Sequence, residues 1–112
     1  MEQPTIKHIS TQKPEALAAL IEPKPNQVVS MALSNSDHIY MTLFSFADGE
    51  MVSEEEYTGT TMYYLLEGET KITRQGREHR LKAGDVLAVP AQELHAVGGL
   101  AAFKMLQITI TE

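Results

Sequence analysis

The chain has 112 residues, of which 43% are hydrophobic and 21% charged, with a formal net charge of −6 and no cysteine. This composition fits one compact domain that buries roughly 65% of the surface its unfolded form exposes, and it excludes disulfides and thiolate chemistry. The surplus of carboxylates disfavours nucleic acid as a partner, because Lys and Arg contacts to phosphate supply most of that affinity. No apolar run approaches the ~18 to 20 residues of a membrane span, and no charged-then-apolar start resembles a secretion signal. We therefore expect a cytoplasmic protein without a membrane partner.

Residues 1–27 differ from the rest of the chain because they hold four of its five prolines. The run Glu15–Ile21 is compatible with one or two helical turns that begin near Pro14. We interpret residues 1–27 as an N-terminal arm with a short helix or strand, and residues 28–112 as the folded domain.

From Val28 onward, short apolar runs alternate with turn residues, which is the pattern of sandwiches and barrels. The turns include Asp48-Gly49, Glu67-Gly68 and Gln75-Gly76. We expect strands at 28–33, 38–46, 62–66, 70–74, 77–81, 86–89, 95–97 and 103–109. Several runs, such as Met62–Leu66, are apolar on both faces, so both faces of the sheet must be covered, as in a small closed antiparallel barrel.

Two spaced motifs carry a family resemblance. The first runs from Gly49 to Gly68 and ends in Tyr-Leu-Leu-Glu-Gly, and the second opens with Ala-Gly-Asp-Val at Gly84 and ends at His95. Across about residues 38–110, these spacings resemble the two motifs of the cupin superfamily. The resemblance implies an all-β, cupin-type antiparallel β-barrel (double-stranded β-helix or jelly roll) with a short N-terminal arm. It is most similar to small single-domain, RmlC-like cupins.

In cupins, two histidines and a glutamate of the first motif and one histidine of the second hold a divalent metal. The matching positions here are Glu55, Tyr57, Thr61 and His95, so only the last keeps the family's ligand type. The resemblance thus implies a degenerate site in which Glu55 and His95 are the candidate ligands for one ion such as Zn, Fe, Mn or Ni. A shift of one residue in strand register would turn Glu55 outward.

The resemblance also points the His95 imidazole into the barrel, where it would contact a ligand or exchange a proton near neutral pH. If Thr61 faces the interior, then alternation along the strand turns Tyr63 and Leu65 inward as well. Met62, Tyr64 and Leu66 then pack outward.

Two further side chains complete the predicted pocket. Tyr57 offers a phenol at the barrel mouth, and an ordinary polar loop is the alternative reading of its neighbourhood. His38 opens an early strand, where it reaches either the interior or the rim. A separate set of basic residues on the predicted hairpin is interpreted as a solvated edge, with anion binding as the alternative: Lys71, Arg74, Arg77, Arg80 and Lys82.

Three functions remain open at this point. The first is binding of a small molecule in an apolar barrel pocket whose metal site is mostly lost. The second is a metal-dependent enzyme, of the dioxygenase or isomerase type, that uses His95 and Glu55 with a further ligand such as His38. The third is an interaction module in which the barrel is only a scaffold. Apolar outer faces and a proline-rich arm also lead us to expect a homodimer.

Overall fold

The computed structural model describes residues 5–112, and most of these residues lie in strands. In chain order the strands are β1 (Val28–Asn35), β2 (Ile39–Phe46), β3 (Met51–Glu55), β4 (Thr60–Arg74), β5 (Arg77–Lys82), β6 (Val86–Val89), β7 (His95–Gly98) and β8 (Phe103–Ile110). A short 3-10 helix, η1 (Leu17–Leu20), precedes them. Within residues 5–112, no helix is long and apolar enough to cross a membrane. The architecture is all-β, as the sequence predicts.

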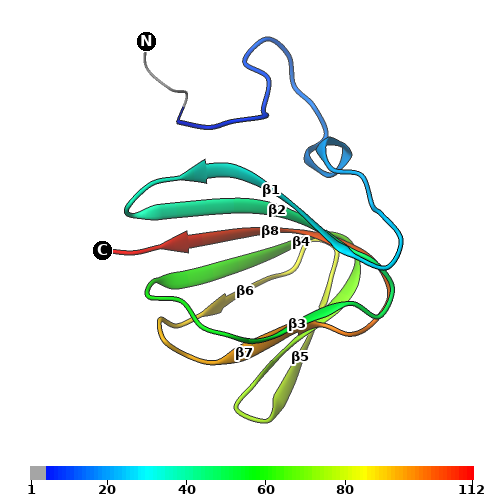
Figure 1. Cartoon of the computed structure of the whole chain (residues 1–112), viewed down its shortest axis with the longest axis vertical. Coiled ribbons are helices and arrows are strands. Elements are labelled where there is room, and N and C mark those ends of the chain that lie inside the picture. The colour runs from blue at the N-terminus through cyan, green and yellow to red at the C-terminus, as the bar shows by residue number, and fades with distance from the viewer. Residues whose placement is uncertain (1–4) are drawn as a thin grey trace.

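The strands form a curled antiparallel sheet in the order β1-β2-β8-β4-β7-β3, and β5 and β6 also pair with β4. In Figure 1, β1, β2, β8 and β4 make one wall of the barrel, and β3, β7 and β5 make the other. The two walls face each other across an interior that the inward side chains line. This arrangement confirms the predicted barrel.

Strand β4 belongs to both walls, which is a correction to the turn that we expect at Glu67-Gly68. The register of β4 against β8 shifts between Leu65 and Glu67, and the strand then continues to Arg74. Gly68 has a φ of 81°, and a Cβ at this position would lie 2.6 Å from the Ala102 carbonyl oxygen. The bulge and its glycine bend β4 away from β6 and β8 toward β5 and β7 without ending it.

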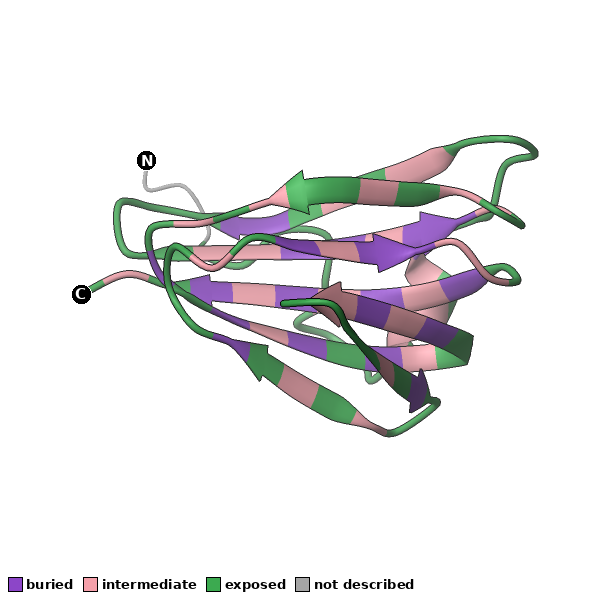
Figure 2. Ribbon diagram, turned by 90° about the horizontal axis from the view of Figure 1, so that it is seen from below, coloured by how far each residue is buried: buried purple, intermediate pink, exposed green. Residues whose placement is uncertain are grey.

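Burial alternates along the strands, as Figure 2 shows. On β4, Thr61, Tyr63 and Leu65 are buried, whereas Tyr64 is 36% exposed. This confirms the alternation predicted for this strand. The inward side chains form the main core, in which the rings of Phe46 and Phe103 stack with their centroids 4.5 Å apart.

A second apolar cluster lies apart from the main core and joins the N-terminal segment to β1 and β2. Ile21 is buried there with Leu33 and Leu43, and Leu17 and Leu20 pack against them. Backbone contacts hold the preceding residues nearby, since the Lys7 amide donates a 2.7 Å hydrogen bond to the Leu33 carbonyl. Figure 1 shows this segment running beside β1. The N-terminal residues described here therefore cover part of the outer surface of the first wall.

Candidate functional site

A cavity of about 130 Å³ lies inside the barrel between the two walls. Most of its lining is apolar, and its polar groups come from β3, β4, β8 and the loop after β3. The lining residues are Phe44, Phe46, Val52, Glu55, Tyr57, Tyr63, Val97, Met105 and Gln107. An apolar cavity with a few converging polar groups is the usual form of a small-molecule site.

Strand β3 contributes both Val52 and Glu55 to this lining, although simple alternation would place them on opposite faces. The register of β3 against β7 shifts between these two residues, and Glu54 adopts a left-handed φ of 56°. The bulge returns Glu55 to the inner face, where it is half-buried and opposite His95. A β-bulge in a polar stretch is also why the sequence expectation omitted this strand.

Tyr63 and His95 form a buried pair beside the cavity. The Tyr63 hydroxyl lies 2.6 Å from His95 Nε2, and His95 Nδ1 lies 2.9 Å from the Glu93 carbonyl oxygen. Because a carbonyl only accepts, Nδ1 carries the proton, and in the neutral imidazole Nε2 accepts from the Tyr63 hydroxyl. Burial, then the nearby Tyr57 and Glu55, raise the pKa of Tyr63 well above its ordinary value. The phenol therefore remains a donor.

Tyr57 lines the cavity on the side of the barrel rim. Its carbonyl accepts a 2.7 Å hydrogen bond from the Gln92 amide, which ties the loop after β3 to the loop before β7. Burial raises the pKa of Tyr57, the Gln107 amide lowers it in part, and the Glu55 carboxylate raises it further. Tyr57 also lines a second hollow at the rim together with Tyr40. Tyr57 thus lies between the inner cavity and the hollow at the rim.

Gln107 is a cavity residue that the sequence analysis missed. It lies on β8 between Met105 and Thr109, and its amide donates a 3.4 Å hydrogen bond to the Thr109 hydroxyl. Thr109 in turn lies 2.8 Å from the Thr61 hydroxyl, so a buried polar layer borders the cavity. A signal was present, because Gln107 has the inward parity of the apolar residues on the same predicted strand.

The structure separates the predicted pocket residues into three groups. Tyr57 and Tyr63 line the cavity directly. Thr61, Leu65 and His95 are buried beside it, with His95 reached through Tyr63. His38 is exposed, with Nδ1 3.1 Å from the Thr111 carbonyl oxygen at the end of the barrel, and it does not line the cavity.

The donor set does not fit a tightly held divalent metal. Glu55 and His95 face each other across β3 and β7, but the Nε2 lone pair of His95 is occupied by the Tyr63 hydroxyl. Among residues 5–112, no group of three or more His, Cys, Asp and Glu side chains is placed to hold a metal ion. Catalytic zinc ordinarily has three protein ligands. Thr61, at the position where the family has a carboxylate, bonds to Thr109 instead.

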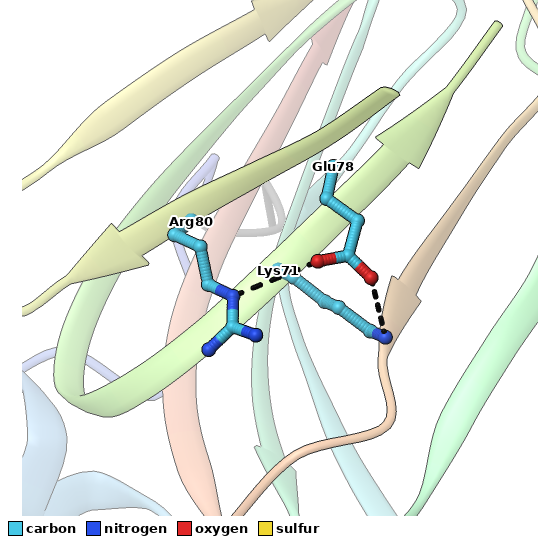
Figure 3. Close-up of polar contacts among 3 residues, drawn as sticks. All are labelled: Lys71, Glu78 and Arg80. Carbon is cyan, nitrogen blue, oxygen red and sulfur yellow. Dashed lines mark hydrogen bonds and ion pairs between the residues drawn. The ribbon is translucent and has the colours of Figure 1, made fainter. Parts of the chain in front are cut away.

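The basic hairpin of β4 and β5 lies away from the cavity. Figure 3 shows Glu78 between two cations, with its carboxylate 3.1 Å from Lys71 Nζ and 3.7 Å from Arg80 Nε. Lys71, and to a smaller extent Arg80, lowers the pKa of this exposed carboxyl. Such exposed pairs contribute little stability. Glu78 offsets part of the positive charge of the hairpin, which agrees with the interpretation of these residues as a solvated edge.

Comparison with known proteins identifies relatives of the whole barrel. Residues 42–108 match the family described as Cupin domain. No curated protein matches the chain. A crystal structure of a cupin superfamily protein from Desulfitobacterium hafniense is 51% identical, with a TM-score of 0.92, and the match covers 96% of this chain and 98% of that one.

Two more distant structures show the same fold. A cupin 2 conserved barrel domain protein from Leptotrichia buccalis is 28% identical with a TM-score of 0.87, and the match covers 96% of this chain and 51% of that one. A conserved protein of unknown function from Streptococcus pyogenes is 24% identical with a TM-score of 0.93, over 98% of this chain and 96% of that one. The likeness thus extends beyond the two motifs to nearly the full chain.

Proposed function

The chain belongs to the cupin superfamily, and from this premise we propose that it binds a small organic molecule inside its barrel. The observation that carries the proposal is the cavity of about 130 Å³ lined by apolar side chains and by Glu55, Tyr57 and Gln107. For scale, an engineered apolar cavity of roughly 150 Å³ accommodates benzene. A ligand of about that size fits here.

The residues divide the work of binding between them. Phe44, Phe46 and Met105 supply apolar contact, while Glu55 and Gln107 fix the orientation of a polar group. His95 acts indirectly in this proposal, because it holds the Tyr63 hydroxyl and thereby sets one wall of the cavity. Tyr57 is the side chain that moves to admit a ligand from the rim, since it lines both the inner cavity and the outer hollow.

The alternative functions receive less support. A metal-dependent enzyme that uses Glu55 and His95 needs a further ligand, and His38 lies exposed at the end of the barrel and does not supply one. A pure scaffold would fill its barrel with side chains, whereas this one retains a cavity. The binding reading accounts for both observations.

A cavity-filling variant tests the proposal. Val52 lines the cavity and is half-buried on β3, so Val52→Phe places a ring in the space that a ligand would occupy. Met51→Phe adds a similar ring at the neighbouring position, which is 47% exposed. Ligand-observed NMR with a set of small aromatic and aliphatic fragments should give hits that persist in Met51→Phe and disappear in Val52→Phe. Identical hits in both variants, or none in the native protein, would refute barrel binding.

We also propose that the chain forms a homodimer through the part of the first wall that the N-terminal segment leaves open. Residues that pair directly across β2, β8, β4 and β6 form an apolar row on the outer side of this wall. We call this the open outer face, and it consists of Ile39, Met62, Tyr64, Val86, Ile108 and Ile110. Four of the six are among the exposed large hydrophobic residues, and a second copy offers the same apolar face in return.

A further inference from the structure

The aromatic side chains around the cavity, together with its single carboxylate, define a ligand class more narrowly than size does. Four of the lining residues are aromatic: Phe44, Phe46, Tyr57 and Tyr63. Glu55 is the one ionisable carboxylate of the lining, and no Lys or Arg is among the described residues that line it. Aromatic faces and a carboxylate both attract positive charge.

We propose that the barrel selects a small organic cation, a quaternary ammonium or protonated amine of about the size of choline, held by the aromatic rings and the Glu55 carboxylate. This inference rests on the proposed binding function and adds the charge of the ligand to it. Quaternary ammonium groups are recognised in proteins by aromatic cages, because the negative faces of the rings replace weakly held water around the cation.

The position of Glu55 supports the choice. It is half-buried on the inner face only because the bulge at Glu54 puts it there, and it is directly opposite His95. Both nitrogens of the His95 imidazole are engaged elsewhere, Nε2 by the Tyr63 hydroxyl and Nδ1 by the Glu93 carbonyl, and no hydrogen bond or ion pair joins His95 to Glu55 among the described residues. A carboxylate that borders a mostly apolar cavity without a cationic partner in that lining favours a cation as the occupant.

The potential inside the barrel has the same sign. The Glu55 carboxylate contributes to the raised pKa of both Tyr57 and Tyr63, which means that its negative charge is felt across the cavity. The net charge of −6 adds a weaker, longer-range attraction for cations. An anionic ligand would meet Glu55 without any neutralising partner. A neutral ligand would offer Glu55 a hydrogen bond at most, whereas a cation also neutralises its charge.

Matched ligands and matched variants test the inference. Choline is compared by isothermal titration calorimetry with dimethylbutanol, its neutral isostere with carbon in place of nitrogen. Glu55→Gln removes the charge at nearly constant shape, and Glu56→Gln removes one charge at the exposed neighbouring position as a control. We expect choline to bind at least roughly tenfold more tightly than dimethylbutanol, and to lose about tenfold in Glu55→Gln but not in Glu56→Gln.

Each other outcome has a distinct meaning. Equal binding of choline and dimethylbutanol would overturn the cation inference and leave barrel binding intact. Binding of a neutral aromatic probe such as phenol, without choline, would do the same. Equal losses of choline affinity in Glu55→Gln and Glu56→Gln would mean that only the net charge of the protein matters, and would also overturn the inference. Binding of none of the three probes would count against both the inference and the proposed function.

Discussion

The hydroxyl of Tyr63 lies 2.6 Å from Nε2 of His95, so the one histidine that matches the family's metal ligand is engaged by a phenol from β4. The second imidazole nitrogen is fixed by the Glu93 carbonyl at 2.9 Å. With both nitrogens satisfied, His95 orients a wall of the cavity. This relationship leads to the first three predictions.

Removing the Tyr63 hydroxyl should destabilise the fold. Tyr63→Phe leaves the buried His95 Nε2 without its partner, which costs about 1 to 3 kcal/mol in the free energy of unfolding. Tyr64→Phe is the matched control, because Tyr64 is the next residue and is 36% exposed, and it should change the free energy by less than about 0.5 kcal/mol. Urea denaturation followed by circular dichroism measures both. Equal changes in the free energy of unfolding for the two variants would contradict a stabilising hydrogen bond between Tyr63 and His95.

The raised pKa values of Tyr63 and Tyr57 predict a loss of stability at alkaline pH. Below pH ~10 the folded and unfolded phenols are both protonated, so their contribution is constant. Above pH ~10 the unfolded phenols ionise before the folded ones, and stability falls by up to about 1.4 kcal/mol per pH unit for each group over that interval. Denaturation curves between pH 8 and 11 should fall less steeply for Tyr63→Phe than for the native protein. Parallel curves would contradict the assignment.

Metal addition should leave the protein unchanged. Glu55 and His95 are the two candidate donors, and Nε2 of His95 is occupied. A site with a micromolar Kd would add ~2.7 kcal/mol to the free energy of unfolding at a metal concentration a hundredfold above that Kd. We expect no such gain with Zn, Fe, Mn or Ni. Thermal melts and elemental analysis of reloaded native protein and His95→Ala measure this. Near-stoichiometric metal that is lost in His95→Ala would instead restore the enzyme hypothesis.

The sequence predicts most of the barrel because turns and alternation are local signals. Asp48-Gly49, Gln75-Gly76 and Gly84-Asp85 lie between strands, as predicted, and the inward parity of Thr61, Tyr63 and Leu65 follows from period-two alternation. The spacing of the two motifs further indicates the cupin family. The turns and the alternation require only neighbouring residues, and the alternation places Tyr63 inward without a structure. Tyr57 is a candidate only through its position in the motif, and the sequence leaves an ordinary polar loop open for it.

The two bulges explain what the sequence could not provide. At Leu65–Glu67 a bulge carries β4 through a predicted turn, and at Glu54 another one returns Glu55 to the interior. The residue types identify neither bulge. Glu54 is an ordinary residue in an acidic run, although it adopts a positive φ, and Glu67-Gly68 has the composition of a turn. The hydrogen bond from Tyr63 to His95 joins residues 32 apart in sequence, which no local pattern encodes.

The bulge at Glu54 provides a fourth prediction. A non-glycine residue at a φ of 56° costs about 1 to 2 kcal/mol, which Glu54→Gly recovers in part, so this variant should change stability by between about 0 and +1 kcal/mol. Glu54→Val should destabilise by about 1 kcal/mol or more, because a β-branched residue resists this conformation. It should also weaken choline binding by turning Glu55 outward. Unchanged choline binding in Glu54→Val would show that the bulge does not position Glu55 for binding.

The fifth prediction concerns association. Ile110 is 54% exposed on the open outer face, and Leu94 is 56% exposed in the loop before β7. If two copies pair through the open outer face, Ile110→Lys should shift the mass toward the 12.4 kDa monomer, and Leu94→Lys should not. Light scattering after gel filtration at micromolar concentration measures the mass. A native monomer under these conditions would contradict the dimer.

Because β4 pairs with β5, β6, β7 and β8, all of its partners follow it in the chain. The strand that crosses both walls is thus synthesised well before the strands that complete its hydrogen bonds, and it remains an open edge until β8 arrives. Such non-local pairing makes folding slow and gives the nascent chain a period of exposure to aggregation. Once closed, the same strand cannot open alone, so its amides should exchange with solvent only through global unfolding.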